Sequence, residues 1–206
     1  MAEKKRRNPS QARAQATVDA ILEATFQILE RDGLSKLTTS RIAERAGVSI
    51  GTLYQYFSDR DAILVAMGER QSDALRETIT SIVLDSREPS GVRSIVRALM
   101  HGLPGSPETR MILSDALFRS GGEAQVGRQH LTFLDSISGR RELDFVLGKE
   151  SAFILTHAVI YLLRAAAAEP ELQLDQDALE DELVHLMESY IANLAHRSQA
   201  GALTPR

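Results

Sequence analysis

The 206-residue sequence predicts an all-α protein of about nine helices, and three observations support this fold class. Apolar residues recur at spacings of three and four along most of the chain, which is typical of amphipathic helices. No segment shows a convincing alternation of apolar and polar residues, the pattern of a half-buried strand. Clusters of Gly, Pro and Ser separate the periodic segments at distances that suit helices joined by short loops.

The first helix is expected to begin with Ser10 as its N-terminal cap and to run to about Asp32, where Gly33 ends it. Its buried face is defined by apolar or small residues at helical spacing, namely Ile21, Leu22, Ala24, Thr25, Ile28 and Leu29.

Two short helices should follow. The first is capped by Thr38 or Thr39 and ends at Ala46, and the second covers about residues 50–57. Gly47 lies between them, where a left-handed backbone conformation is inexpensive for glycine. The pair is therefore expected to cross at a tight turn.

The rest of the chain is expected to form longer helices. Ser58 is the predicted cap of a fourth helix that extends to about Leu84, with Asp59 and Asp61 near the positive end of its dipole. Further helices are predicted over about 91–103, 107–119, 122–137, 147–168 and 175–197.

The two short helices have the pattern of a helix-turn-helix. Ile42, Val48 and Leu53 are spaced to form a small shared core, and Ser49 is placed to cap the second helix. An ordinary helical hairpin with a glycine turn would show similar apolar spacing. The segment from 49 to 56, however, is rich in polar residues where a plain core helix would be apolar.

This polar composition suits a helix whose first turn enters the DNA major groove. Gly51 would let the backbone approach closely, Gln55 can bond adenine through two hydrogen bonds, and Thr52 can bond several bases. Tyr54 and Tyr56 can donate hydrogen bonds to phosphate. The segment therefore predicts double-stranded DNA as a partner.

Charge is distributed unevenly in a way that agrees with a polyanionic partner. The whole chain has a net charge of −4, but residues 1–60 hold 10 Lys/Arg and 7 Asp/Glu, a net charge of +3. The remaining residues carry a net charge of −7. The cationic stretch 4–7 is expected to act as a mobile arm, although a solvated tail alone would give the same imbalance.

The stretch "GLSKLTTSRIAERAGVSIGTLYQYFSDRDAIL", residues 33–64, resembles the DNA-binding domain of the TetR/AcrR family of bacterial transcriptional regulators. The resemblance covers about residues 15–65. Carried over by position, it implies a DNA-facing set of Thr39, Ser40, Ser49, Ile50, Gly51, Thr52, Tyr54, Gln55, Tyr56 and Arg60. Arg60 stands where the family more often has Lys, and Ile50 is apolar at a position that is often polar.

The resemblance also implies that the chain has two domains with different functions. Residues 1–60 would form the DNA-binding domain, and residues 61–206 would form an effector-binding and dimerisation domain. The last two helices of each subunit would pair in a homodimer. A predicted stripe on the last helix, which internal packing would explain equally well, comprises Leu179, Leu183, Leu186, Tyr190 and Leu194.

The resemblance further implies that a small-molecule effector binds among the central helices and releases the DNA operator. The candidate polar residues of its pocket are Arg110, Asp115, His130, His157 and Tyr161, of which the last two could equally be packing or interface residues. The body is poor in aromatic residues and has no Trp, so an amphiphilic or mainly apolar effector is expected.

Other classes of function find little support. The chain has no Cys, and no two of its five His are three or four residues apart, so no catalytic site, metal site or cofactor is expected. The longest apolar run is far shorter than the ~20 residues of a membrane span, so a cytoplasmic location is expected, with the protein at the nucleoid when bound. The alternatives are an effector-independent DNA-binding protein that acts through a protein partner, and an all-helical enzyme.

Overall fold

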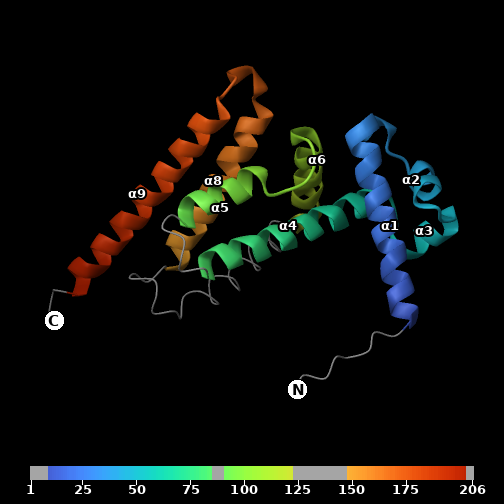
Figure 1. The fold of residues 1–206 in the computed structure, drawn as a ribbon, viewed down its shortest axis with the longest axis horizontal. Helices are drawn as coiled ribbons and strands as arrows, with labels where there is room; N and C mark the ends of the chain where they lie inside the picture. The colour runs from blue at the N-terminus through green and yellow to red at the C-terminus, as the bar shows by residue number, and fades with distance from the viewer. Residues whose placement is uncertain (1–8, 85–90, 123–147, 203–206) are drawn as a thin grey trace. The chain divides into compact units, whose positions relative to one another are not determined.

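The computed structural model describes residues 9–84, 91–122 and 148–202, which are helical with no strand among them (Figure 1). The predicted all-α fold is confirmed. In chain order the elements are α1 (Pro9–Asp32), η1 (Leu34–Lys36), α2 (Thr39–Ala46), α3 (Ile50–Tyr56), α4 (Arg60–Leu84), α5 (Gly91–His101), α6 (Pro107–Leu117), η2 (Phe118–Gly122), α8 (Lys149–Ala168), η3 (Pro170–Leu172) and α9 (Gln176–Ala202). Most of the helix predicted over 122–137 lies outside the described residues.

The chain forms two compact units. One comprises residues 1–71 and 105–120, and the other comprises residues 72–104 and 121–206. Helix α4 contributes its first half to one unit and its second half to the other. The units thus group α6 with the N-terminal helices, whereas the expected domains divide the chain once, after residue 60.

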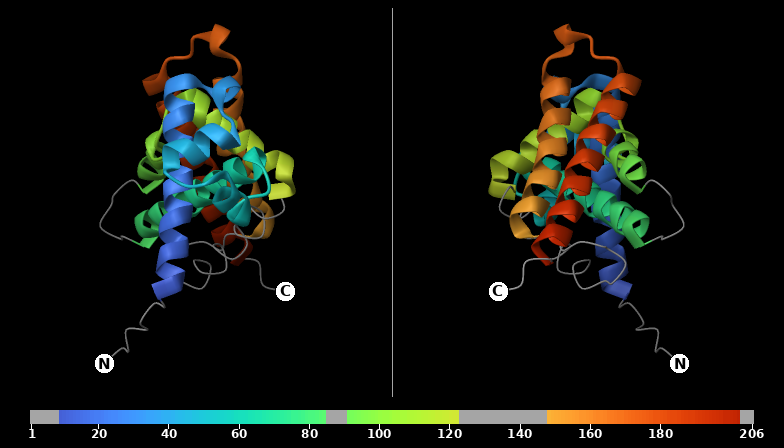
Figure 2. Two further views of the ribbon diagram at one scale, coloured as in Figure 1. Left: turned by 90° about the vertical axis from the view of Figure 1, so that its right-hand side faces the viewer. Right: turned by 90° about the vertical axis from the view of Figure 1, so that its left-hand side faces the viewer.

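A single apolar core holds the first unit together. It joins α1, the η1 segment, α2, α3, the start of α4, and α6; α2 and α3 lie beside α1 (Figure 1; Figure 2, left). The most deeply buried side chains of this core are Ile21, Leu37, Ile42, Leu53, Ile63, Leu64 and Leu113. Ile42 and Leu53 are fully buried in one cluster, and Val48 packs against that cluster, so the predicted shared core of the two short helices is confirmed.

Side-chain caps fix the ends of these helices. The hydroxyl of Thr38, and not that of Thr39, caps α2 by accepting the N–H of Arg41 in its first turn. Gly47 follows α2 with φ +69°, a left-handed conformation that glycine adopts without strain. The predicted glycine turn is confirmed.

Two predicted caps were wrong. Helix α1 begins at Pro9, so Ser10 lies inside its first turn; the fixed φ of proline suits the first helical position. Asp59, rather than Ser58, caps α4, because its carboxylate accepts the N–H of Ala62 at 2.7 Å while the Ser58 hydroxyl donates to that carboxylate. These two hydrogen bonds, the one from Ala62 first, hold the pKa of Asp59 below its usual value.

Helices α4 and α6 lie close together at Gly68. A Cβ atom at this position would lie 2.9 Å from the carbonyl oxygen of Leu113 and 3.4 Å from the Cβ of Leu117. The carbonyl belongs to the backbone of α6, so it cannot rotate away from an added methyl group. The glycine therefore sets the distance between the two helices.

The substitution Gly68→Ala is expected to destabilise the protein. Overpacking typically lowers the free energy of unfolding by about 1–3 kcal/mol, and the higher helix propensity of Ala raises it by only about 1 kcal/mol. The net decrease is therefore up to about 2 kcal/mol. The melting temperature, followed by circular dichroism, measures the change. Gly51→Ala is the matched control, because a Cβ there meets nothing closer than the Ser49 hydroxyl at 3.8 Å. A Gly68 variant as stable as this control would contradict the prediction.

The second unit has its own apolar core between α5, α8 and α9. Its buried residues are Val96, Met100, Val159, Leu183, Val184 and Met187. Beside it, Arg93 and Arg97 bond the nearly buried carboxylate of Glu180 at 2.7 and 2.9 Å. The hydrogen bond from Arg97 lowers the pKa of Glu180 most. Burial raises this pKa and the bond from Arg93 lowers it, so the pKa stays below its usual value. These pairs tie α5 to α9, and α8 and α9 run side by side (Figure 2, right).

Candidate nucleic-acid interface

Helix α3 presents most of its side chains to solvent. Its cap is Ser49, whose hydroxyl accepts the N–H of Thr52 at 2.9 Å. Leu53 is the fully buried side chain that anchors it to α2 and α4. Because one residue in seven carries the packing, the rest of this helix is available for an external partner.

The exposed face of α3 combines apolar, aromatic and amide groups. Ile50 is 42% exposed, Tyr54 52% and Tyr56 38%, and Gln55 is also exposed. Large apolar and aromatic side chains are rarely left in water without a partner to cover them when they cluster on one short helix. The cluster therefore marks a binding face.

Gly51 has no structural requirement within the chain. Its backbone is helical, and an added Cβ would find only ordinary van der Waals contact with Ser49. Glycine in a helix costs about 1 kcal/mol relative to alanine. A residue that destabilises its helix without relieving a clash is consistent with space kept for an approaching ligand.

Two hydroxyl pairs order the polar groups of this face. The hydroxyls of Thr39 and Tyr54 are hydrogen bonded at 3.2 Å, which links the first residue of α2 to the middle of α3. The hydroxyls of Ser49 and Thr52 are hydrogen bonded at 2.8 Å. Of the predicted DNA-facing set, Thr39 and Tyr54 are thus paired between the two helices, and Ser49 and Thr52 are paired at the start of α3.

Arg60 begins α4 beside this face. Its guanidinium donates to the carbonyl oxygen of Leu37 at 3.4 Å and lies 3.5 Å from the carboxylate of Asp61. The side chain is 41% exposed, so part of the cation remains in solvent. Ser40, the last member of the predicted set, is exposed at the start of α2.

The residues predicted for an effector pocket are distributed over both units. Arg110 and Asp115 lie on α6 of the first unit, whereas His157 and Tyr161 lie on α8 of the second. His130 lies outside the described residues. On α8 the rings of Phe153, His157 and Tyr161 stack in sequence, with centroids 4.0 and 6.2 Å apart. Within the described ranges, no three His, Asp or Glu side chains gather as a metal site would require.

The predicted stripe on α9 divides between two environments. Leu183 is 3% exposed in the core of its own unit, with Leu179 packed against that core, whereas Leu186 is 48% exposed. Tyr190 and Leu194 are half-buried. Repeated spacing alone did not distinguish the side of the helix that packs inward from the side that stays in solvent.

An apolar groove that the sequence did not reveal lies along α8, η3 and α9. It has a volume of about 370 Å³ and its apolar lining includes Leu162, Ala165, Ala166, Leu172, Leu174, Leu179, Leu183 and Leu186. The two leucines between the helices are both exposed, Leu172 by 54% and Leu174 by 44%. Their alternation in "ELQLD", within a loop that is otherwise polar, is the pattern that could have indicated them.

Similarity to known proteins agrees with this geometry. Residues 21–67 match the family described as "Bacterial regulatory proteins, tetR family". The HTH-type transcriptional regulator BetI of Stenotrophomonas maltophilia (strain R551-3) is 30% identical over 84 residues, 41% of this chain and 42% of that protein. The nucleoid occlusion factor SlmA of Haemophilus ducreyi is 29% identical over 135 residues, 61% of each chain. The chain thus spans about two fifths to three fifths of the length of these curated relatives.

Solved structures share the fold over most of the chain. The fatty acid degradation regulator FadR from Bacillus halodurans superimposes with a TM-score of 0.63 at 19% identity, covering 89% of this chain and 96% of that one. SmeT of Stenotrophomonas maltophilia, in complex with triclosan, gives a TM-score of 0.58 at 20% identity over 87% and 91% of the two chains.

Among the residues described, no helix combines the length and the apolar character that a membrane crossing requires. The family match falls on the capped helices α2 and α3 and on the parts of α1 and α4 that support them. Residues 21–67 thus belong to the N-terminal domain of the tetR family of bacterial regulatory proteins, and α2 and α3 form its helix-turn-helix.

Proposed function

We propose that this protein is a repressor that binds a pseudo-palindromic operator as a homodimer and leaves it when a small molecule binds. The observation that carries the DNA-binding part is the exposed, capped helix α3, in which only Leu53 is committed to the core. Its glycine, hydroxyl and amide groups are those that approach and read base edges in the major groove. With DNA as its partner, the protein works in the bacterial cytoplasm.

The two helices of the motif divide the contacts. Helix α3 places its first turn, with Ile50, Gly51 and Thr52, in the major groove, and Gln55 bonds an adenine. The start of α2 and the tyrosine hydroxyls bond phosphate, which positions the protein without reading sequence. The bond between Thr39 and Tyr54 supports this division, because it holds both hydroxyls at the same edge of the motif.

The exposed groove on α8, η3 and α9 supports the homodimer. Leu162, Leu172, Leu174 and Leu186 all line it and all are at least 44% exposed. A second copy of the same face, related by a two-fold axis, would cover these side chains. Two DNA-binding units in such a dimer would read half-sites about 34–36 Å apart, one helical turn of DNA.

Release of DNA requires an effector that prefers the conformation unable to bind the operator. Helix α4 is the proposed lever because its residues are shared between the two compact units. The names of two structural neighbours, a fatty acid degradation regulator and a complex with triclosan, support an amphiphilic or mainly apolar effector. The expected effector contacts, Arg110 and Asp115 on α6 and His157 and Tyr161 on α8, remain a prediction.

A second candidate function is DNA binding without a small-molecule effector, with the output carried by a protein partner. The observation that favours it is the similarity to the nucleoid occlusion factor SlmA, whose name describes a role other than transcription. Both candidates require the same contacts with DNA, so they differ only in the events that come after binding.

Selection of bound fragments from a random DNA pool, followed by gel retardation, tests the proposal. The full-length protein should enrich a sequence with two inverted half-sites and retard it at moderate salt. Release of that DNA by a lipid or metabolite extract would favour the effector-controlled repressor over the partner-dependent protein. If no fragment is enriched and none is retarded, DNA binding itself is wrong.

The substitution Arg60→Ala should weaken binding to all DNA sequences alike. The guanidinium is partly free in solvent and is placed to neutralise a phosphate, so its loss should reduce the salt dependence of affinity by about one unit of slope. Gel retardation at several salt concentrations, on the selected operator and on an unrelated fragment, measures both effects. A loss confined to the operator would show that Arg60 reads bases instead.

A further inference from the structure

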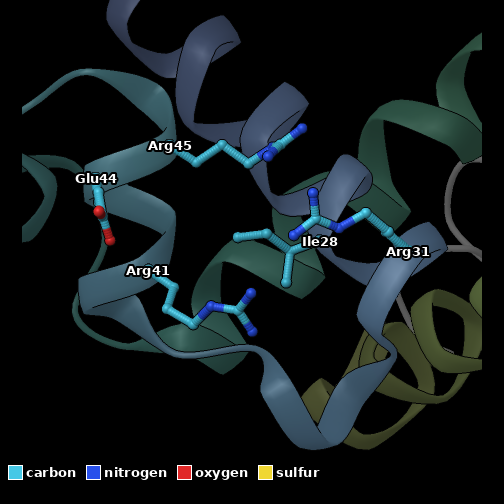
Figure 3. A pocket seen from close by; sticks show the side chains of 5 residues that line it. All are labelled: Ile28, Arg31, Arg41, Glu44 and Arg45. Carbon is cyan, nitrogen blue, oxygen red and sulfur yellow. The ribbon is translucent and has the colours of Figure 1, made fainter.

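Three arginines of the N-terminal unit line one hollow, which is separate from the exposed face of α3. Arg31 of α1 and Arg41 and Arg45 of α2 line a hollow of about 290 Å³, together with Ile28 and Glu44. Figure 3 shows the guanidinium ends of the three arginines directed toward the region over Ile28, whereas Glu44 lies to the side on α2. We refer to this feature as the arginine hollow.

Two arginines of the hollow already bind a carboxylate of their own chain, that of Asp32. Asp32 accepts hydrogen bonds from Arg31 at 3.1 and 3.4 Å and from Arg41 at 2.7 Å. The bond from Arg31, and then that from Arg41, lower the pKa of Asp32. The spacing of the guanidinium groups is therefore suited to the planar geometry of a carboxylate.

Most hydrogen-bond donors of the three arginines remain available. Arg31 donates only to Asp32, Arg41 to Asp32 and to the carbonyl of Lys36, and Arg45 to the side chain of Gln27, among the bonds of the described residues. Each guanidinium has about five N–H donors. With Asp32 and Glu44 counted against the three arginines, the hollow keeps a net positive charge.

The arginine hollow does not belong to the DNA-facing side of the motif. Along α2, Arg41 lies about 200° around the helix axis from Thr39, and Arg45 lies about 240° from it. Thr39 marks the DNA side because it bonds Tyr54 of α3. Arg41 instead bonds the α1–η1 segment, on the opposite side of α2. A ligand in the hollow would therefore leave the groove-facing surface free.

We propose that the arginine hollow binds an acidic segment of a partner protein through its carboxylates. The bound Asp32 shows that the site accommodates this chemistry, and the free donors and residual positive charge leave room for a second carboxylate. The position behind α2 makes such a contact compatible with DNA binding. The inference goes beyond the proposed repressor function, because it assigns a protein contact that DNA does not occupy.

Fluorescence anisotropy with the full-length protein tests this site without DNA. The probe is a fluorescein-labelled peptide of repeated Glu-Glu-Leu triplets, and the control peptide has Gln in place of Glu. Binding of the acidic peptide should weaken by about tenfold in Arg45→Gln and in Arg31→Gln, because each removes charge-assisted hydrogen bonds. Both arginines are exposed, so folding should be retained, as circular dichroism would verify. Arg13→Gln, which removes an exposed arginine of α1 outside the hollow, should bind as the unaltered protein does.

A variant that is expected to bind the acidic peptide more tightly distinguishes the proposed site from a general loss of structure, which could only weaken binding. Asp32→Asn removes the carboxylate that competes for Arg31 and Arg41, so it should bind the acidic peptide more tightly. Equal binding of the acidic and Gln peptides would overturn the proposal. So would weaker DNA retardation with a reduced salt slope in Arg31→Gln and Arg45→Gln and unchanged peptide binding, which would assign the hollow to nucleic acid.

Discussion

Replacement of Leu186 by Asp is expected to dissociate the proposed homodimer and to lower the affinity for a two-half-site operator by roughly 10³-fold, the gain that a second linked site supplies. Leu186 is 48% exposed in one chain and lines the groove formed with α8 and η3. In the dimer its side chain would be covered by the partner. An aspartate there would bury an unpaired carboxylate, which costs several kcal/mol.

The exposure of Leu186 makes this variant informative, because a single chain should tolerate a charge at a position that water already reaches. Ala192→Asp is the matched control, since it adds the same charge at an exposed position of the same helix about 120° around the axis from Leu186. Sedimentation or light scattering would report the oligomeric state, and gel retardation would report the affinity. A Leu186→Asp protein that remains dimeric would assign the groove to another partner.

The sequence was sufficient for features that depend on neighbouring residues. The helix-turn-helix core of Ile42, Val48 and Leu53 follows from spacing alone, and the conformation of Gly47 follows from the need for a tight turn. Such features are determined within a few residues, where propensity and capping act. For the same reason the long helices were placed nearly correctly.

The prediction of a helix cap was wrong where two neighbouring residues were equally suitable. Ser58 and Asp59 can both cap α4, and the structure gives the cap to Asp59 while Ser58 supports it by a hydrogen bond. Only the direction in which the chain enters the helix distinguishes these two residues. That direction is set by the packing of α3 and α4, which spacing does not contain.

Features that require two distant segments were not predictable. Arg31 of α1 and Arg45 of α2 line the same arginine hollow, and nothing in the linear order of charges indicates that these side chains share a site. The division of the α9 stripe is similar, since Leu183 is buried by α5 and α8 while Leu186 is not. Helical periodicity identifies an apolar face but not the partner that covers it.

The substitution Gln55→Ala is expected to remove the preference for one base at one position of each half-site. An amide that bonds adenine through two hydrogen bonds contributes about 1–3 kcal/mol of discrimination, equivalent to roughly 5- to 150-fold in affinity. Binding of the variant to operators changed at each position in turn should therefore become insensitive at one position and remain selective elsewhere.

Tyr56→Phe provides the comparison on the same helix. It removes a hydroxyl that is proposed to bond phosphate, so it should weaken binding to every operator variant by a similar factor. If Gln55→Ala behaved in the same uniform way, its amide would be a phosphate contact and the base-reading role would be wrong.

Stability separates the loss of base recognition from a general loss of fold. Gln55 is exposed, and alanine has at least as high a helix propensity as glutamine, so α3 should be as stable in the variant as in the unaltered protein. Leu53, which anchors the helix, is untouched. A variant with an unchanged melting temperature and relaxed selectivity at a single base pair would therefore locate the recognition in the amide group itself.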